Sequence, residues 1–471
     1  MAARRGKETG GNSKGKPRLL DHLKAGAPAE DLAHYDAATL AASAELAEAI
    51  LLKHRTGKSL VSVENDSGIE RQGRPMTIVT VVNDNMPFLF NSVMGEITQS
   101  VGEPALVLHP VLAVRHTKQG AELLGEAAQG KPEDGVDRVS LIHVHIGRLD
   151  AAEAKALAER IRGVLKQVHA AVSDWKPMPA RLDQAISDFR YAPVPMEEKD
   201  VAEAIAFLEW LRDDNFTFLG IREYRYSGGE ETGVLERMRK PGLGILQDPD
   251  VQVLRRGDQP VTATPEIRAF LHGPEPLIVT KANTKSLVHR RIYLDYVGIK
   301  TFDAKGKLLG ELRIVGLFTS TAYTRSVLKI PYLRSKVEAV IEASGFDPSD
   351  HSGKALINVL ESFPRDELFQ IDVPSLRRSA IAILALGERP RVRALYRIDQ
   401  FDRFVSVLVY VPRDRYDSEV RQKIGGYLAE AFDGHVSAYY PAFPEGRLAR
   451  VHFIIGRRGG ETPRPDQEEL E

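Results

Sequence analysis

The segment from residue 76 to residue 172 alternates between strand-like and helix-like patterns, and its order limits the possible folds more than any other feature. Residues 76–82 are rich in β-branched side chains, as β-strands are. Val93, Ile97 and Val101 then recur every four residues, as one buried face of a helix should. Strand-like runs at 105–116 and 139–147 and a helical run at 151–172 follow. The resulting order βαββα predicts an α+β sandwich, an architecture that favours small-molecule sensing or assembly over catalysis.

The residues between the first strand and the first helix are the most promising binding element. An Asp84-Asn85 pair turns the chain, and Pro87 suits a first helical position, where no backbone donor is needed. The free N–H groups of a helix start attract anions, so those of Phe88 to Phe90 could bind the carboxylate of an amino acid. The ammonium or amide end would then meet Asp84 or Asn91. The predicted effector-binding residues are Asp84, Asn85, Phe88, Leu89, Phe90 and Asn91. The alternative is structural, with Asp84 simply capping the helix.

Composition narrows the class of protein. The chain has 471 residues, which suggests about three domains as a prior. A formal net charge of −1 implies no bulk attraction to nucleic acid or an anionic membrane. Cysteine is absent, which excludes disulfides, thiol nucleophiles and thiolate metal sites and fits a reducing compartment. No apolar run approaches the roughly 20 residues of a membrane span, and the basic N-terminus lacks the apolar core of a signal peptide. We therefore expect a cytoplasmic protein.

The fold class predicted for the whole chain is multidomain α+β, with one sandwich near each end and a sheet-rich block between them. In the last sandwich, of order ββαββ, we expect Val405, Val407 and Val409 to point inward against a helix at 415–431. The predicted segments are a disordered tail (1–17), a helical N-terminal segment (18–72), the first sandwich (73–173), a linker and helix (174–214), the sheet-rich domain (215–334), a helical connector (335–389), the second sandwich (390–458) and a polar tail or linker (459–471).

Motifs for catalysis or cofactor binding are sparse. No G-x-G-x-x-G follows a strand, so a dinucleotide site is not supported. His143 and His145 share one strand face and could present two imidazoles to a metal, but no third ligand lies at a recognisable spacing, which favours ordinary strand histidines. Residues 361–369 could supply an acid and a base, or fix a domain contact. A basic cluster could hold an anion or form a solvated or interdomain surface; it consists of Lys281, Lys285, His289, Arg290 and Arg291. We predict no catalytic, cofactor-binding or metal-binding residue.

Several stretches resemble the large NAD-specific glutamate dehydrogenases of bacteria. They lie at 84–93, 108–115, 210–220, 316–320, 330–331 and 361–370. The resemblance spans residues from about 20 to 460, and several of its motifs are long enough to be specific. In that family the chain is several times longer. Its N-terminal half is built of ACT-like and PAS-like modules with helical motifs, and the dehydrogenase domain lies near the C-terminus.

The resemblance implies a regulatory and assembly portion of such an enzyme. The family's active-site lysines and dinucleotide-binding glycines have no counterpart here, so none is carried over, and the chain alone is predicted to be non-catalytic. NAD and the oxidation of L-glutamate to 2-oxoglutarate and ammonium are implied for the parent enzyme only. The expected partners are the remainder of that enzyme, further copies of the chain and an amino-acid effector. Two alternatives remain: a free-standing amino-acid-sensing protein of ACT type, and a purely structural oligomerisation module.

Overall fold

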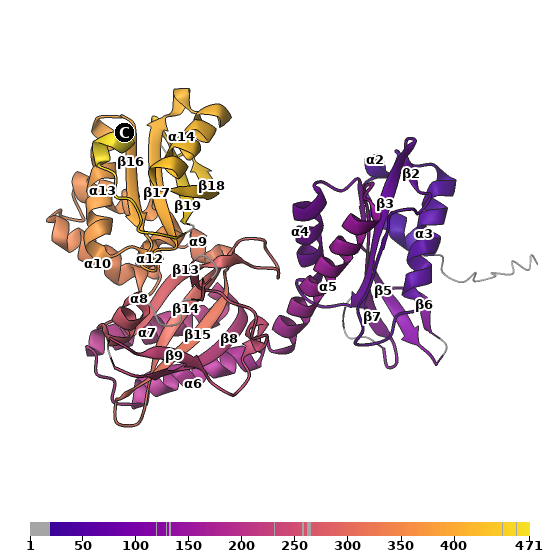
Figure 1. The fold of residues 1–471 in the computed structure, drawn as a ribbon, viewed down its shortest axis with the longest axis horizontal. Coiled ribbons are helices and arrows are strands. Elements are labelled where there is room, and N and C mark those ends of the chain that lie inside the picture. The colour runs from indigo at the N-terminus through magenta and orange to yellow at the C-terminus, as the bar shows by residue number, and fades with distance from the viewer. Residues whose placement is uncertain are drawn as a thin grey trace, which may run out of the picture. The chain divides into compact units, whose positions relative to one another are not determined.

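The computed structural model describes residues 19–471 except 119, 129, 131–132, 230, 257–258, 261–264, 445 and 458, so the predicted tail 1–17 lies outside the described residues. The chain divides into two compact units (Figure 1). Unit 1 is Met1–Val172 together with Leu287–Arg291, and unit 2 is Ser173–Ser286 together with Ile292–Glu471. Within the described residues, no helix is both long enough and apolar enough to cross a membrane.

Unit 1 is built on one antiparallel sheet of order β1-β3-β7-β5-β6, with β2 paired to β3 and β4 paired to β7. Its strands are β1 (Leu60–Glu64), β2 (Glu70–Arg71), β3 (Arg74–Asp84), β4 (Leu106–Leu108), β5 (Val111–His116), β6 (Ala121–Glu126) and β7 (Asp137–Gly147). Its helices are α1 (Leu19–Ala25), α2 (Ala29–Leu32), α3 (Ala37–Leu51), α4 (Leu89–Val101) and α5 (Ala151–Ser173).

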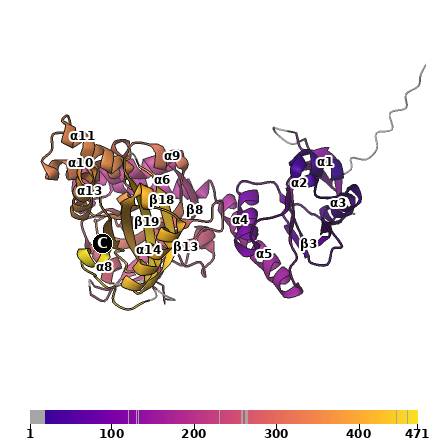
Figure 2. The same ribbon diagram turned by 90° about the horizontal axis from the view of Figure 1, so that it is seen from above.

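Helices cover both faces of this sheet because the apolar side chains of β3 alternate. Ile78 and Val82 pack with α1 and α3, whereas Val79 and Val81 pack with α4 and α5. Figure 2 shows these two helical layers on opposite sides of β3. The predicted βαββα order is confirmed in outline, with two differences: the run 105–116 forms two short strands on either side of His109-Pro110, and the further strand β6 lies in the stretch between the two predicted strands. The segment 18–72 is helical only as far as Leu51, because β1 and β2 follow.

Unit 2 begins with two helices, α6 (Pro177–Tyr191) and α7 (Glu198–Trp210). The prediction of a linker before the second helix was therefore wrong for α6. Its prolines lie in the first turn, where backbone N–H groups have no acceptor within the helix, so the N–H that proline lacks removes no helical hydrogen bond. The central antiparallel sheet has the order β10-β8-β15-β14-β13, with β9 paired to β8. Its strands are β8 (Phe216–Ser227), β9 (Val234–Arg237), β10 (Leu243–Gly244), β13 (Leu277–Lys285), β14 (Tyr293–Phe302) and β15 (Leu308–Phe318).

The predicted hairpin turn between β14 and β15 is present. The Asp303 N–H donates to the Lys307 carbonyl at 2.9 Å, and Gly306 has a φ of +78°, a conformation that favours glycine. Two minor elements complete this region: the ribbon of β11 (Arg255–Arg256) and β12 (Gln259–Pro260), and the helix α8 (Pro265–His272).

A helical connector leads to the last sandwich. Its helices are α9 (Ser320–Thr324), α10 (Leu333–Ser344), α11 (His351–Ser362), α12 (Arg365–Gln370) and α13 (Val373–Glu388). The sandwich has the sheet order β16-β17-β19-β18. Its elements are β16 (Arg393–Ile398), β17 (Phe404–Pro412), α14 (Ser418–Ala431), β18 (Gly434–Ala442), β19 (Leu448–Arg457) and α15 (Gln467–Leu470). The last helix was not predicted in the polar tail 459–471.

The sheet of this sandwich is buried on both faces. Val405, Val407 and Val409 pack with Leu428 of α14, which confirms their predicted inward orientation. The opposite face of β17 presents Leu408 and Tyr410 to the large core that unites the rest of unit 2.

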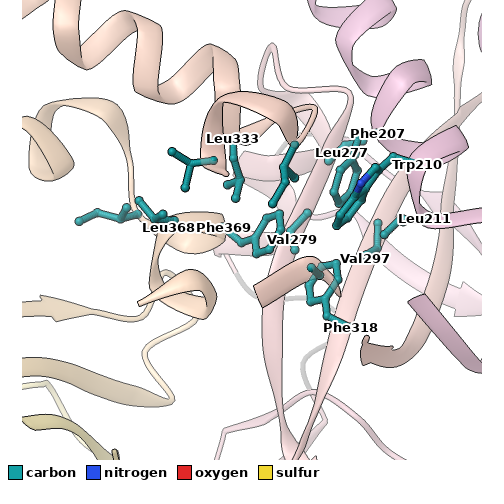
Figure 3. Packing of buried hydrophobic residues seen from close by; sticks show 14 of the residues in the cluster. Phe207, Trp210, Leu211, Leu277, Val279, Val297, Phe318, Leu333, Leu368 and Phe369 are labelled. Carbon is teal, nitrogen blue, oxygen red and sulfur yellow. The ribbon is translucent and has the colours of Figure 1, made fainter. Parts of the chain in front are cut away.

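That large core is rich in aromatic side chains (Figure 3). The rings of Phe318 from β15 and Phe369 from α12 stack with centroids 4.6 Å apart, and Phe207 of α7 lies beside Trp210. The central sheet and the connector helices therefore share one hydrophobic interior rather than forming separate modules.

Candidate functional site

The helix start that was predicted to bind an effector differs in detail from the prediction. Helix α4 begins at Leu89, and Phe88 occupies the N-cap position with a φ of +68° and no side-chain cap. The prediction that Pro87 takes a first helical position was therefore wrong, and so was the alternative in which Asp84 caps the helix. Asp84 instead ends β3, and its Oδ2 accepts a hydrogen bond from the Gly57 N–H at 2.6 Å. The Asn85 N–H donates to the Arg138 carbonyl at 2.8 Å.

A short segment of the same unit, Leu287–Arg291, lies against this helix start. The His289 N–H donates to Ser92 Oγ at 2.9 Å, and the imidazole of His289 lies 5.1 Å from the ring of Phe88. One turn further along α4, the Arg291 guanidinium forms an ion pair with Glu96. Phe88, Ser92 and Glu96 follow the four-residue spacing of one helix face. The structure therefore brings part of the predicted basic cluster onto the predicted effector element.

The other residues of these two sets have different surroundings. Leu89 is buried, and Phe90 stacks on the imidazole of His109 with centroids 4.3 Å apart. Asn91 is exposed. Arg290 belongs to the same short segment as His289, and its N–H donates to the Val288 carbonyl.

The two lysines of the basic cluster belong to unit 2. The Lys281 ammonium is 2.6 Å from Asp295 and 3.1 Å from Asp366, and that of Lys285 lies 5.4 Å from the ring centroid of Tyr293. A single anion site made of all five residues was therefore a wrong interpretation, because Lys281 is already neutralised by two carboxylates.

A chain of four titratable side chains runs from Asp84 through the interior of unit 1. His54 Nδ1 lies 3.1 Å from His116 Nε2, and His116 Nδ1 lies 2.7 Å from Asp137 Oδ2. The Thr56 hydroxyl donates to the same Asp137 oxygen at 2.8 Å and is the main cause of that carboxyl's lowered pKa. At the other end, His54 Nε2 faces Asp84 Oδ1 at 3.7 Å, and neither atom has a hydrogen-bond partner.

Counting donors explains that gap. When Asp137 is ionised, His116 Nδ1 must donate to it, so Nε2 of a neutral His116 accepts from His54 Nδ1. A neutral His54 then has no proton on Nε2, and two acceptors face each other across the 3.7 Å to Asp84. One added proton would give this contact a donor. Burial lowers the pKa of His54, so the chain takes up that proton only in acid.

The two strand histidines considered as metal ligands form a closed hydrogen-bonded group in the core. Ser43 Oγ of α3 lies 2.7 Å from Nε2 of His143 and 2.8 Å from Nε2 of His145, while Thr80 Oγ1 lies 2.9 Å from Nδ1 of His143. Burial lowers the pKa of His143 to about 3 and that of His145 to about 4. Among the described residues, no group of three or more potential ligands could hold a metal ion.

The charged stretch at 361–369 forms contacts within unit 2. The Glu367 carboxylate forms an ion pair with Arg397 of β16 and lies 4.0 Å from His452 of β19. Lys336 donates to the carbonyls of Leu368, Phe369 and Ile371, where α12 ends. Burial lowers the pKa of Lys336 to about 7. These contacts agree with the interpretation that the stretch fixes a domain contact.

Sequence reasoning missed the chain through His54, His116 and Asp137. Its members are 62 and 21 residues apart along the sequence. No local spacing could have revealed them. The only available signal was that His116 ends one predicted strand and that Asp137 lies two residues before the next, and that signal is weak.

Taken together, the two sandwiches and the helical connector define a multidomain α+β protein with ferredoxin-like modules. Comparisons with known proteins agree. The family model described as the glutamate dehydrogenase ACT1 domain matches residues 19–161, that for helical motif 1 matches residues 330–389, and that for the ACT2 domain matches residues 393–471.

Three relatives, each named NAD-specific glutamate dehydrogenase, resemble the chain over most of its length. The relative from Halomonas elongata is 36% identical over 82% of this chain, and that from Pseudomonas aeruginosa is 37% identical over 80%. The relative from Mycobacterium tuberculosis is 28% identical over 74%. The chain belongs to the NAD-specific glutamate dehydrogenase family and corresponds to an N-terminal portion of it. It spans only 24%, 23% and 20% of these relatives' own lengths.

Proposed function

We propose that this chain is the regulatory and assembly region of an NAD-dependent glutamate dehydrogenase and has no dehydrogenase activity of its own. The observation that carries the proposal is the order of the three family matches, in which two ACT domains flank a helical motif. The parent reaction would convert L-glutamate, NAD⁺ and water to 2-oxoglutarate, ammonium and NADH. The remainder of the enzyme and further copies of the chain are the proposed partners.

The geometry of unit 1 supports a role in sensing. The first N–H groups of α4, those of Leu89 to Asn91, have no acceptor within the helix. A carboxylate there would gain about 0.3–1 kcal/mol from the helix dipole, or up to about 2 when partly buried. Charge-assisted hydrogen bonds of about 1.5–3 kcal/mol each would add to this and could leave millimolar affinity, near −4 kcal/mol. The segment Leu287–Arg291 contacts the first turns of the same helix. An amino-acid effector would therefore either displace this segment or bind in a site that the segment helps to form.

Two measurements on the purified chain test the proposal. Glutamate-dependent NADH production above a blank would refute the non-catalytic role, with a complete glutamate dehydrogenase as the positive control. Calorimetry with a panel of amino acids then tests the effector role, comparing the wild-type chain with Ser92→Ala, which removes the acceptor for the His289 N–H. Thr98→Ala is the matched control, because Thr98 is exposed on the same helix and lies outside the face formed by Phe88, Ser92 and Glu96.

Heat with one class of amino acid, altered by Ser92→Ala but not by Thr98→Ala, would support sensing at α4. The absence of heat with every amino acid would leave assembly as the proposed role, and light scattering of the chain then shows whether it forms a homo-oligomer.

A further inference from the structure

Helix α13 bears a groove whose rim is entirely basic. The groove has a volume of about 490 Å³ and extends from Arg377 of α13 to Arg393, the first residue of β16. Four apolar residues and five arginines line it, and these five arginines are called the rim. The apolar residues are Ile381, Ala382, Ala385 and Leu386, and the rim residues are Arg377, Arg378, Arg389, Arg391 and Arg393.

The rim has little neutralising charge. Within the described part of the chain, no carboxylate lies within 4 Å of Arg377, Arg378, Arg389 or Arg391, although Arg378 donates to Ser375 Oγ. These four side chains are exposed. Clustered cations repel one another, so an empty rim of this kind is electrostatically unfavourable and attracts an anionic partner.

Among the residues that the structure describes, Arg393 is the one rim arginine that pairs with a carboxylate. Arg393 Nη1 lies 3.1 Å from Oε2 of Glu471, which directly follows the short helix α15. Within this chain, a carboxylate that follows a short helix therefore already pairs with one rim arginine.

The dimensions of the groove favour an elongated partner. From Arg377 to Arg389 the helix rises by about 18 Å at 1.5 Å per residue, so a single carboxylate or phosphate cannot reach both ends. Ala382 and Ala385 are small and admit the close approach of another helix. An apolar centre with a charged rim, rich in arginine, is the usual anatomy of a protein interface. The opposite face of α13, with Leu376 and Ala380, is already buried in the core of unit 2.

We propose that this groove docks an acidic amphipathic helix of a partner polypeptide. Apolar side chains of that helix would cover Ile381 and Ala385, and its carboxylates would pair with the rim arginines. Bidentate guanidinium–carboxylate pairs would then fix its register.

The test uses the full chain and a fluorescent synthetic peptide, an amphipathic helix with glutamates flanking one leucine stripe. A second peptide has every glutamate replaced by glutamine. We expect the acidic peptide to bind at least about tenfold more tightly than the glutamine peptide, with an affinity that falls as salt rises. The double variant Arg378→Glu/Arg389→Glu should lose at least about tenfold in affinity for the acidic peptide.

The matched control is Arg239→Glu/Arg415→Glu, which reverses two exposed arginines away from the groove and should bind like the wild-type chain. Circular dichroism and the thermal midpoint check that all variants fold. Equal affinity for both peptides, no measurable binding, or unchanged binding by the groove variant would overturn the proposal. Displacement of the peptide by low concentrations of inorganic triphosphate at constant ionic strength would also overturn it, because it would identify a site for small anions.

Discussion

The buried pair His143 and His145 should make unit 1 sensitive to acid. Ser43 has a single hydroxyl proton and two imidazole nitrogens within 2.8 Å. If it donates to His143 Nε2 and accepts from His145 Nε2–H, then His143 Nδ1–H can donate to Thr80. Only His145 Nδ1, a lone pair, remains without a partner. A proton on His145 would create a buried donor without an acceptor, and a proton on His143 would deprive the Ser43 hydroxyl of its acceptor.

The sign of the effect follows from these pKa values. The pKa is about 3 for His143 and about 4 for His145 in the folded protein, against about 6.5 in the unfolded chain. The unfolded state therefore binds more protons below pH 6.5, and the free energy of unfolding falls as the pH decreases toward 4. Each histidine contributes a slope of about 1.4 kcal/mol per pH unit, so at pH 5 each lowers stability by about 2 kcal/mol relative to neutral pH.

The variant His145→Gln separates this effect from the other titrating groups. Glutamine keeps an N–H donor near the position of Nε2 but cannot titrate, so the average slope between pH 6.5 and 5 should decrease by about 1 kcal/mol per pH unit. His435→Gln, on β18 of unit 2, is the control and should leave the slope measured in unit 1 unchanged. Hydrogen exchange of the β7 amides reports the stability of unit 1 at each pH. An unchanged slope in His145→Gln would refute the hydrogen-bond reasoning.

Three further predictions concern stability and are measured by denaturant unfolding at neutral pH. Glu367→Gln should lower the free energy of unfolding by about 3–5 kcal/mol, because it leaves the largely buried Arg397 without its ion partner; Glu419→Gln, in an exposed pair with Lys423, should change it by less than about 1 kcal/mol. Phe369→Ala should remove about 3–5 kcal/mol by opening a cavity beside Phe318, and a loss below about 1 kcal/mol would contradict the packing in Figure 3. Gly306→Ala should be destabilising because of the positive φ, whereas Gly387→Ala, within α13, should be neutral or stabilising.

The helices and strands of the candidate site could be predicted from the sequence, whereas the contacts between its side chains depended on the tertiary structure. The sequence indicated that residues 84–91 end a strand and open a helix, and this is confirmed in outline. It could not indicate that Phe88 adopts a left-handed conformation or that Leu287–Arg291 packs on the helix, about 200 residues away. The same limit applied to Lys281, whose two carboxylate partners come from β14 and α12.

What the sequence by itself determined were the elements whose pattern is local. The four-residue recurrence of Val93 and Ile97, the alternation of Val405, Val407 and Val409, and the turn at Gly306 are all properties of neighbouring residues, because helix and strand periodicities follow from backbone geometry. Only the tertiary structure decided which polar groups meet. His54 and His116 became one hydrogen-bonded chain, and His143 and His145 became one group around Ser43, because most buried polar atoms pair with whatever partner is within reach, wherever in the sequence that partner lies.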